Sequence, residues 1–338
     1  MRVPSRLTAA ALALGLTGAL SACGHASPRA DLAQAGPEAR LEGLTALDRR
    51  VAGVAWRLAR ANADLCPVVR PRAGWSLQSA GQYGPELRPI AERRYGLEGD
   101  LPGVLAAPPQ SPAAAAGLGA GDLLLAVDGQ ALQPGSGLGA ESYDGLQANI
   151  EVLDQAAVRG PVALRVRRDG VERAVTLRPV PACAYATQVE VTGTLRSRAD
   201  GRHVFISDGM ANLAGNDDEL AFVLAHELAH AVLEHRTDPA VTGARGEANA
   251  RITLRRGLSL SAEADADRMG LYLLARAGFD PHAAVEFLTR YAEADGGAAF
   301  VQVNAGGIYA SAPARRRARG PVLADIVARR EANRPLSP

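Results

Sequence analysis

Leu224-Ala225-His226-Glu227-Leu228-Ala229-His230 is an H-E-x-x-H element, and the surrounding sequence has the pattern of a buried helix. Apolar residues recur at helical spacing from position 220 to position 232. Asn216 precedes them as a candidate N-cap, with an acidic residue three positions on. At 3.6 residues per turn, His226 and His230 share one face. Two such imidazoles can hold one Zn²⁺, and Glu227 can accept a proton from a water that zinc activates.

A catalytic zinc usually takes three protein ligands and keeps one position open, so a third ligand is expected. Glu263 and Asp267 lie one turn apart on a second predicted helix around residues 261–270. We assign Glu263 as the third ligand and Asp267 as a carboxylate that orients a ligand histidine. A third histidine ten residues after the first is the alternative, but Arg236 occupies that position. The adjacent His235 is one residue out of register and is interpreted as a helix-end histidine.

These motifs resemble the HtpX and CAAX-prenyl-endopeptidase family of zinc metallopeptidases, and most of all its soluble periplasmic branch in bacteria. The resemblance covers residues 187–330 and implies a gluzincin fold and an endopeptidase acting on misfolded or membrane-associated proteins. By the same resemblance His226, His230 and Glu263 are the zinc ligands and Glu227 is the general base. The residues that carry it are Asp218-Glu219-Leu220-Ala221, the H-E-x-x-H element, Glu263-Ala264-Asp265-Ala266-Asp267-Arg268-Met269-Gly270 and Ala277-Gly278-Phe279-Asp280-Pro281.

Two stretches depart from that family's pattern. An Asn-Ala pair is common on the strand that holds the substrate, where this chain has Arg196-Ser197-Arg198-Ala199. A His-Pro followed by Arg is common near the C-terminus, and here Ala312 stands in place of the histidine. Loss of one oxyanion donor typically costs about 10²–10³ in rate. His282 and Tyr309 are weak substitutes. The arginines that follow are interpreted as a solvated basic run, namely Arg315, Arg316, Arg317 and Arg319.

Residues 95–181 have the pattern of a compact domain with short strands and Gly-rich turns. Val162–Arg168 and Val171–Leu177 are predicted to form a hairpin that turns at Asp169-Gly170. A helix is predicted around residues 143–157. The series Ser-Pro-Ala-Ala, Gly-Leu, Gly-Asp and Asp-Gly resembles a bacterial PDZ domain with the permuted strand order of periplasmic proteases.

A PDZ domain binds an extended chain end by adding it as a strand to a sheet edge. Tyr95-Gly96-Leu97 occupies the position of that family's carboxylate-binding loop. We therefore predict that this loop receives the end of a substrate or partner chain. A PDZ fold that serves only as a spacer or packing surface is the alternative.

Residues 1–22 have the pattern of a signal peptide, because two arginines precede an apolar run that is too short to span a bilayer. Leu20-Ser21-Ala22-Cys23 resembles a bacterial lipobox, which implies a lipid anchor on Cys23. Because Gly24 follows, the resemblance implies the outer membrane, facing the periplasm. An ordinary secretory signal is the alternative. Residues 23–40 are predicted to be a tether, and residues 41–94 an amphipathic helix and a connector.

Two further cysteines lie at the ends of the predicted β-rich domain. In an oxidising compartment Cys66 and Cys183 are expected to pair and to pin those ends together. Two free buried thiols are the alternative.

The formal net charge of +1 and the 4% of aromatic residues argue against nucleic-acid binding. The predicted fold class is α+β, with a PDZ-like domain followed by a mainly α-helical gluzincin domain. The predicted function is a membrane-anchored periplasmic zinc metalloendopeptidase that hydrolyses unfolded or misassembled envelope proteins. The alternative is a zinc-binding chaperone or adaptor lipoprotein with little or no activity. A PDZ scaffold with structural zinc fits less well, because structural sites usually have four protein ligands. The oligomeric state is not predicted.

Overall fold

The computed structural model describes residues 35–135, 140–199, 203–234, 260–294 and 312–337. The predicted lipidation site Cys23 and the residues His235, Arg236 and Tyr309 lie outside them. None of the helices in the described ranges is long and apolar enough to cross a membrane.

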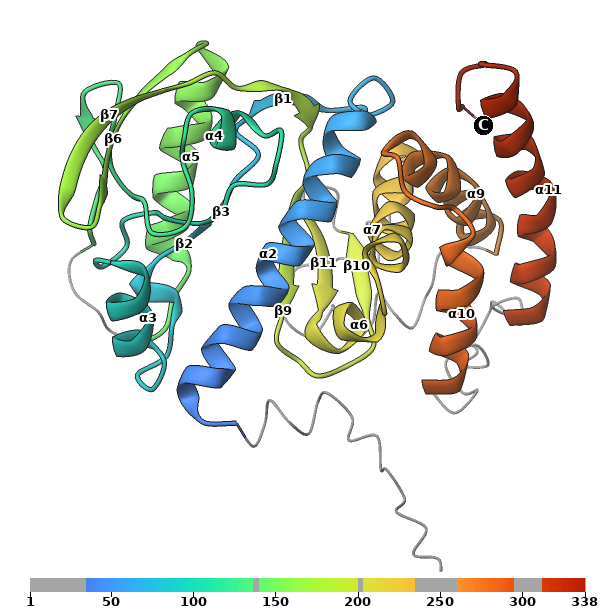
Figure 1. Ribbon diagram of the computed structural model, residues 1–338, viewed down its shortest axis with the longest axis horizontal. Helices are drawn as coiled ribbons and strands as arrows, with labels where there is room; N and C mark the ends of the chain where they lie inside the picture. Colours follow the sequence, from blue (N-terminus) through green and yellow to red (C-terminus); the bar gives the residue numbers. More distant parts are fainter. Residues whose placement is uncertain (1–34, 136–139, 200–202, 235–259, 295–311, 338) are drawn as a thin grey trace, which may run out of the picture.

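Helix α2 (Pro37–Ala61) runs between the two halves of the molecule (Figure 1). It begins four residues before the predicted start, so part of the predicted tether is helical. The first turns of α2 place Leu41 in a small cluster with residues of the β-rich half. Further along, Val51 and Leu58 enter the large core of the helical half. One amphipathic helix therefore packs against both halves.

The β-rich unit comprises residues 69–183, and most of its strands form one six-stranded sheet in the order β2-β3-β4-β6-β7, with β5 paired to β4. Helix α5 (Asp144–Val158) contributes Leu153 and Ala156 to the core of this sheet. The remaining elements are β1 (Val69–Arg72), β2 (Ser76–Gln78), η1 (Ala80–Gln82), α3 (Arg88–Tyr95), β3 (Gly103–Ala106), α4 (Pro112–Ala115), β4 (Leu123–Val127), β5 (Gln130–Ala131), β6 (Val162–Arg168), β7 (Val171–Leu177) and β8 (Val180–Cys183).

The predicted hairpin forms with the predicted bounds, because β6 and β7 pair along their whole length. Asp169 and Gly170 both have positive φ, as the tight hairpin turn requires. The predicted start of the unit at residue 95 was placed too late. β2 pairs with β3, and β1 pairs with β8, so the predicted connector supplies strands of the unit.

The two halves meet closely where Gly74 lies against Trp56 of α2. Gly74 has a φ of +70°, and a Cβ there would lie 2.8 Å from the indole ring. The position therefore requires glycine both for its conformation and for space.

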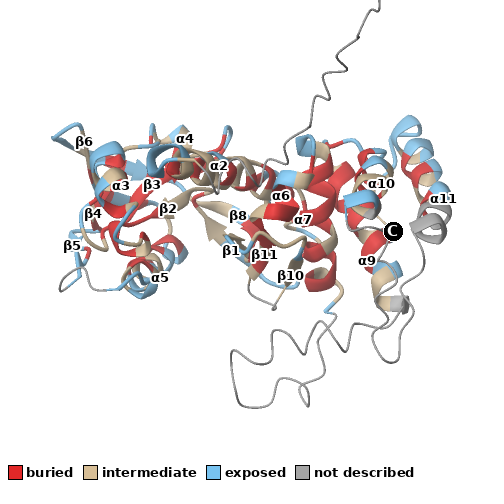
Figure 2. Cartoon of the chain, turned by 90° about the horizontal axis from the view of Figure 1, so that it is seen from below, coloured by how far each residue is buried: buried red, intermediate tan, exposed pale blue. Residues whose placement is uncertain are grey.

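The helical unit comprises the described residues from 186 onward and is built around helix α7 (Asp217–Val232), whose residues are mostly buried (Figure 2). A three-stranded sheet in the order β10-β11-β9 lies beside α7, with β9 parallel and β10 antiparallel to β11. The strand predicted over residues 189–194 lies earlier in the sequence, because β9 begins at Ala186 and ends at Glu190. The other elements are β9 (Ala186–Glu190), β10 (Ser197–Ala199), β11 (His203–Ser207), α6 (Asp208–Leu213), α9 (Leu260–Arg276), α10 (Ala283–Ala294) and α11 (Ala312–Glu331).

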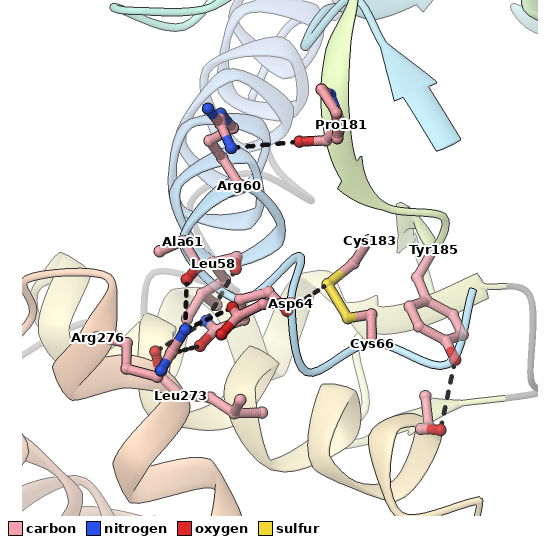
Figure 3. The surroundings of a disulfide bond; sticks show 12 residues. Leu58, Arg60, Ala61, Asp64, Cys66, Pro181, Cys183, Tyr185, Leu273 and Arg276 are labelled. Atoms are coloured by element: carbon pink, nitrogen blue, oxygen red, sulfur yellow. Dashed lines mark hydrogen bonds and ion pairs between the residues drawn. A yellow bond between two sulfur atoms is a disulfide. The ribbon is translucent and has the colours of Figure 1, made fainter. Parts of the chain in front are cut away.

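A disulfide joins Cys66 to Cys183, with 5.5 Å between the two Cα atoms (Figure 3). It lies beside the ladder in which Val69 pairs with Cys183, so both ends of the β-rich unit are held at one place. Arg276 of α9 binds the end of α2 nearby, through the side chain of Asn62 at 2.9 Å. The end of α2, the base of the β-rich unit and α9 therefore meet around this disulfide.

Candidate metal centre

Helix α7 is fixed at its first turn by side chains that its sequence supplies. The Oδ1 of Asn216 accepts a hydrogen bond from the Glu219 N–H at 2.9 Å, as the sequence pattern predicts for an N-cap. The Glu219 side chain is fully buried, and Arg290 of α10 donates to its carboxylate at 2.9 Å. A buried carboxylate needs such a partner, since leaving it unpaired would cost several kcal/mol. The start of α7 is thus tied to α10.

Helix α9 approaches α7 very closely at the level of the H-E-x-x-H element. Gly270 lies against the backbone of His226, and a Cβ there would be 3.2 Å from the His226 Cα. A glycine at this contact lets the two helices approach closely enough for carboxylates one and two turns earlier on α9 to reach the histidines.

The side chains of His226, His230 and Glu263 converge, and one ligand atom from each lies within 4.8 Å of the others. The two Nε2 atoms are 3.1 Å apart. The Glu263 oxygens lie 3.4 Å from the Nε2 of His226 and 3.6 Å from the Nε2 of His230. Tetrahedral zinc with bonds of about 2.0–2.1 Å separates its ligand atoms by about 3.3 Å. The three side chains therefore fit the two-histidine, one-glutamate donor set of a catalytic zinc.

Asp267 lies behind His226, and its Oδ1 is 3.1 Å from the His226 Nδ1. In this arrangement Nδ1–H donates to the carboxylate and the Nε2 lone pair faces the other ligands. The orienting role assigned to Asp267 from the sequence agrees with this geometry.

Arg319 of α11 is also part of this site, because its side chain is 2% exposed and its Nη2 lies 2.6 Å from the Asp267 Oδ2. The interpretation of the arginine run as solvated is therefore wrong for this residue. Within the run of arginines, nothing in the local sequence marks Arg319 as buried. Its burial depends on the packing of α11 on α9, which brings Arg319 to Asp267.

Glu227 is 7% exposed, and its Oε1 accepts a hydrogen bond from the Ser197 Oγ at 2.7 Å. Burial raises the pKa of the Glu227 carboxyl, while His226 and the Ser197 hydroxyl act in the opposite direction. Ser197 belongs to β10, the segment whose sequence departs from the family's usual Asn-Ala pair. Ser197 is therefore a direct hydrogen-bond partner of Glu227, the predicted general base.

Ser197→Ala is expected to lower kcat/KM for peptide cleavage about tenfold, because a hydrogen bond to a charged group contributes roughly 1.5 kcal/mol or more. The lost bond also favoured the ionised form, so the pKa of Glu227 should rise and the acidic limb of the pH–rate profile should move to higher pH. Ser197→Thr keeps a hydroxyl and serves as the matched control. A pH profile in which the alanine variant coincides with wild type would exclude this role for Ser197.

In the zinc-free protein, burial opposes the charged form of His226, but Asp267 and Glu263 outweigh it and raise the pKa of His226 to about 10. The unfolded chain has a histidine pKa of about 6.5. This contribution to stability is therefore fully present below about pH 6.5 and is lost as the pH rises through 10.

The melting temperature of the zinc-free protein should accordingly fall between pH 7 and pH 10. The sequence contains no lysine, so tyrosines, which titrate near the upper end of that window, are the main other groups. Zinc should reverse the trend, because its binding displaces the proton and becomes tighter as the pH rises. In zinc-free His226→Gln, the melting temperature should fall less steeply with pH than in the wild-type protein. A zinc-free melting temperature that rises over this range would contradict the assignment.

The other predicted site residues lie elsewhere. Tyr95 ends α3, and its hydroxyl lies 2.8 Å from the Thr45 Oγ1 of α2. Leu97 is also buried, and the next strand, β3, has β2 on one side and β4 on the other. The strand that follows Tyr95-Gly96-Leu97 therefore has neighbours on both sides, and the predicted carboxylate-binding role of this loop stays a prediction.

The candidate electrophiles are only partly described. His282 is exposed in the turn before α10, and its backbone N–H donates to Asp280. Ala312 begins α11, and Tyr309 lies outside the described residues.

The site combines two histidines of α7, a carboxylate ligand from α9 and an edge strand beside Glu227. This combination is that of a metallopeptidase domain. Residues 191–245 match the family model described as Peptidase family M48. Peptidases of this family are metal-dependent, typically with zinc.

Over 125 residues the chain is 31% identical to a protein of Saccharomyces cerevisiae described as mitochondrial metalloendopeptidase OMA1. The match covers 32% of this chain and 35% of that protein, so the chain spans about a third of the length of this relative. Both comparisons support a metalloendopeptidase, and the family match includes His226, Glu227 and His230.

Proposed function

We propose that this protein is a membrane-anchored zinc metalloendopeptidase of the bacterial cell envelope that hydrolyses unfolded or misassembled proteins. The observation that carries the proposal is the convergence of two histidines and Glu263 at zinc-ligand spacing, with the buried Glu227 beside them. The lipid anchor on Cys23, the periplasmic location and the class of substrate rest on the sequence alone.

The chain's own residues account for the proton transfers of peptide hydrolysis and for the binding of the metal. Zinc held by His226, His230 and Glu263 would lower the pKa of a water and polarise the scissile carbonyl. Glu227 accepts the proton from the attacking water and delivers it to the leaving amine. Its burial raises the pKa of its carboxyl toward the range that a proton shuttle needs.

A substrate backbone has a suitable place to bind beside Glu227. Among the described strands, β10 ends its sheet and pairs only with β11, so its outer edge can accept an extended chain. Ser197 lies on this strand and contacts Glu227, so a peptide added to β10 would lie beside the base. Edge addition recognises the backbone more than side chains, and this favours unfolded substrates.

The β-rich unit is proposed to bind the ends of substrate or partner chains in the manner of a PDZ domain. Its order of strands ends at β2, and β3 is that strand's partner among the described residues. The open edge of β2 supports strand addition there better than the neighbourhood of Tyr95-Gly96-Leu97.

A zinc-binding chaperone or adaptor is the second candidate, and the observation that favours it is Ala312. An alanine side chain cannot stabilise the oxyanion. Loss of one oxyanion donor typically lowers the rate about 10²–10³-fold. Such a protein would capture unfolded chains without cutting them.

Cleavage of a permanently unfolded protein by a soluble form that begins at residue 24 separates the two candidates. The zinc-loaded chain should produce fragments of the unfolded protein in amounts that increase with time. Removal of zinc by a chelator should stop the cleavage, and readdition of zinc should restore it. Metal content is measured in each sample. Suppression of substrate aggregation without fragments, at one zinc per chain, would replace the peptidase with the chaperone.

A further inference from the structure

The C-terminal helix α11 places a charged side chain behind Asp267, on the far side of that carboxylate from His226. Arg319 comes 52 positions after Asp267 in the sequence and is among the largest fully buried side chains of the described structure. Its guanidinium carbon lies 5.3 Å from the ring centroid of Phe222, one turn before His226 on α7. The side chain is thus enclosed by α7, α9 and α11.

Asp267 divides its two oxygens between two partners. Oδ1 lies 3.1 Å from the Nδ1 of His226, and Oδ2 lies 2.6 Å from the Nη2 of Arg319. A carboxylate held by one partner can rotate about its last bond, whereas one held at both oxygens cannot without breaking an ion pair. Arg319 therefore limits the orientation of the group that orients His226.

The charges of the centre favour a cation at this position. Glu263, Glu227 and Asp267 are three largely buried carboxyl groups. Arg198 acts on the Glu227 carboxyl, and Arg319 places its Nη2 2.6 Å from the Asp267 Oδ2. Removing one partner of a buried ion pair is strongly unfavourable, because the charge that remains loses compensation.

Anchoring of α11 alone does not explain a buried arginine. Leu323 and Ile326 already place α11 in the core, the Tyr272 hydroxyl donates to Asp325, and Arg330 donates to the Ala275 carbonyl at 3.0 Å. A buried ion pair often stabilises a fold no better than apolar residues of similar size. The position of Arg319 behind a ligand histidine is therefore better explained by the metal centre than by packing.

We infer that Arg319 is a positioning residue of the zinc centre, which acts through Asp267 to hold the His226 imidazole in the orientation that binds the metal. The inference rests on the proposed zinc site and adds to it a residue from the C-terminal helix. It follows that docking of α11 on α9 completes the metal centre.

The test measures the zinc dissociation constant by competition with a chelator, and records the absorption spectrum of the Co²⁺-substituted protein. Arg319→Gln should weaken zinc binding about 10–100-fold, the usual effect of removing a group that supports a metal ligand. Asp267→Asn should do the same. The double variant should bind zinc no more weakly than Asp267→Asn alone, because Arg319 acts through that carboxylate.

Arg290→Gln is the matched control, because it removes an arginine from another buried carboxylate, Glu219, on the same metal-binding helix. It should lower the melting temperature and leave the zinc dissociation constant and the Co²⁺ spectrum unchanged. Arg319→Lys keeps the charge but not the planar fork, and should recover part of the affinity. If Arg319→Gln does not fold, Asp267→Asn decides, and a zinc dissociation constant within twofold of wild type in it would overturn the inference.

Two further results would overturn the inference while leaving the peptidase intact. One is a zinc dissociation constant for Arg319→Gln within twofold of wild type. The other is full additivity between Arg319→Gln and Asp267→Asn. Absence of zinc binding by the wild-type chain would instead remove the proposed metal centre itself.

Discussion

Glu227→Gln is expected to lower peptide hydrolysis by about 10²–10⁴-fold while the protein keeps its zinc, because a positioned general base contributes that much to the rate. Glutamine has the shape of glutamate and can still accept the hydrogen bond from Ser197, but it cannot take up a proton from water. Glu227 is not one of the three converging ligands, so metal content should stay at one zinc per chain. Cleavage of an unfolded protein, followed by gel and mass spectrometry, is the measurement.

Glu234→Gln provides the matched control for this experiment. Glu234 is an exposed residue just beyond the end of α7, so the substitution makes the same charge change on an adjacent part of the same segment without touching the ligands. Activity close to wild type is expected. Residual cleavage in Glu227→Gln equal to that in Glu234→Gln would show that another group, or a contaminating peptidase, carries the reaction.

Replacement of both Cys66 and Cys183 by alanine should lower the free energy of unfolding by about 4–5 kcal/mol, the chain-entropy estimate for a loop of this length. The two cysteines are 117 positions apart, so the disulfide restricts a large part of the unfolded chain. Urea unfolding of oxidised wild type and of the double variant gives the difference directly.

The single variant Cys66→Ala separates the lost bond from lost packing. It breaks the disulfide while Cys183, which is 1% exposed, keeps its side chain in the core. It should therefore show most of the destabilisation of the double variant. Identical urea midpoints for wild type and both variants would mean that the ladder between β1 and β8 holds this junction without the bond.

Features with a strong local signal could be predicted from the sequence. Asp169-Gly170 fixes a tight turn between two strands of equal length, and Asn216 is a good N-cap, so the hairpin and α7 appear with the predicted bounds. Helical periodicity puts His226 and His230 on one face of a helix, and Glu263 and Asp267 on one face of another. The choice of Glu263 as the third ligand needed more, namely the ligand number of catalytic zinc and the resemblance to a family of zinc peptidases.

Features that depend on distant pairing could not be predicted in the same way. β1 and β2 are only four and three residues long, and β1 acquires its partner more than a hundred positions later. Nothing within such short segments distinguishes a strand from a connector. Ser197 could be noted only as a departure from a family pattern, and its contact with Glu227 appears once β10 packs beside α7.

The path of helix α2 has a consequence for how the molecule can be divided. Val51 and Leu58 belong to the same core as α7, although the β-rich unit separates α2 from α7 in the sequence. The metallopeptidase domain is therefore discontinuous, and the β-rich unit is inserted into it through two ends that the disulfide holds 5.5 Å apart at their Cα atoms. A fragment that begins at the M48 match would lose part of its own core. A chain joined across the insertion would keep most of that core and expose the contacts of α2 around Leu41 and Trp56.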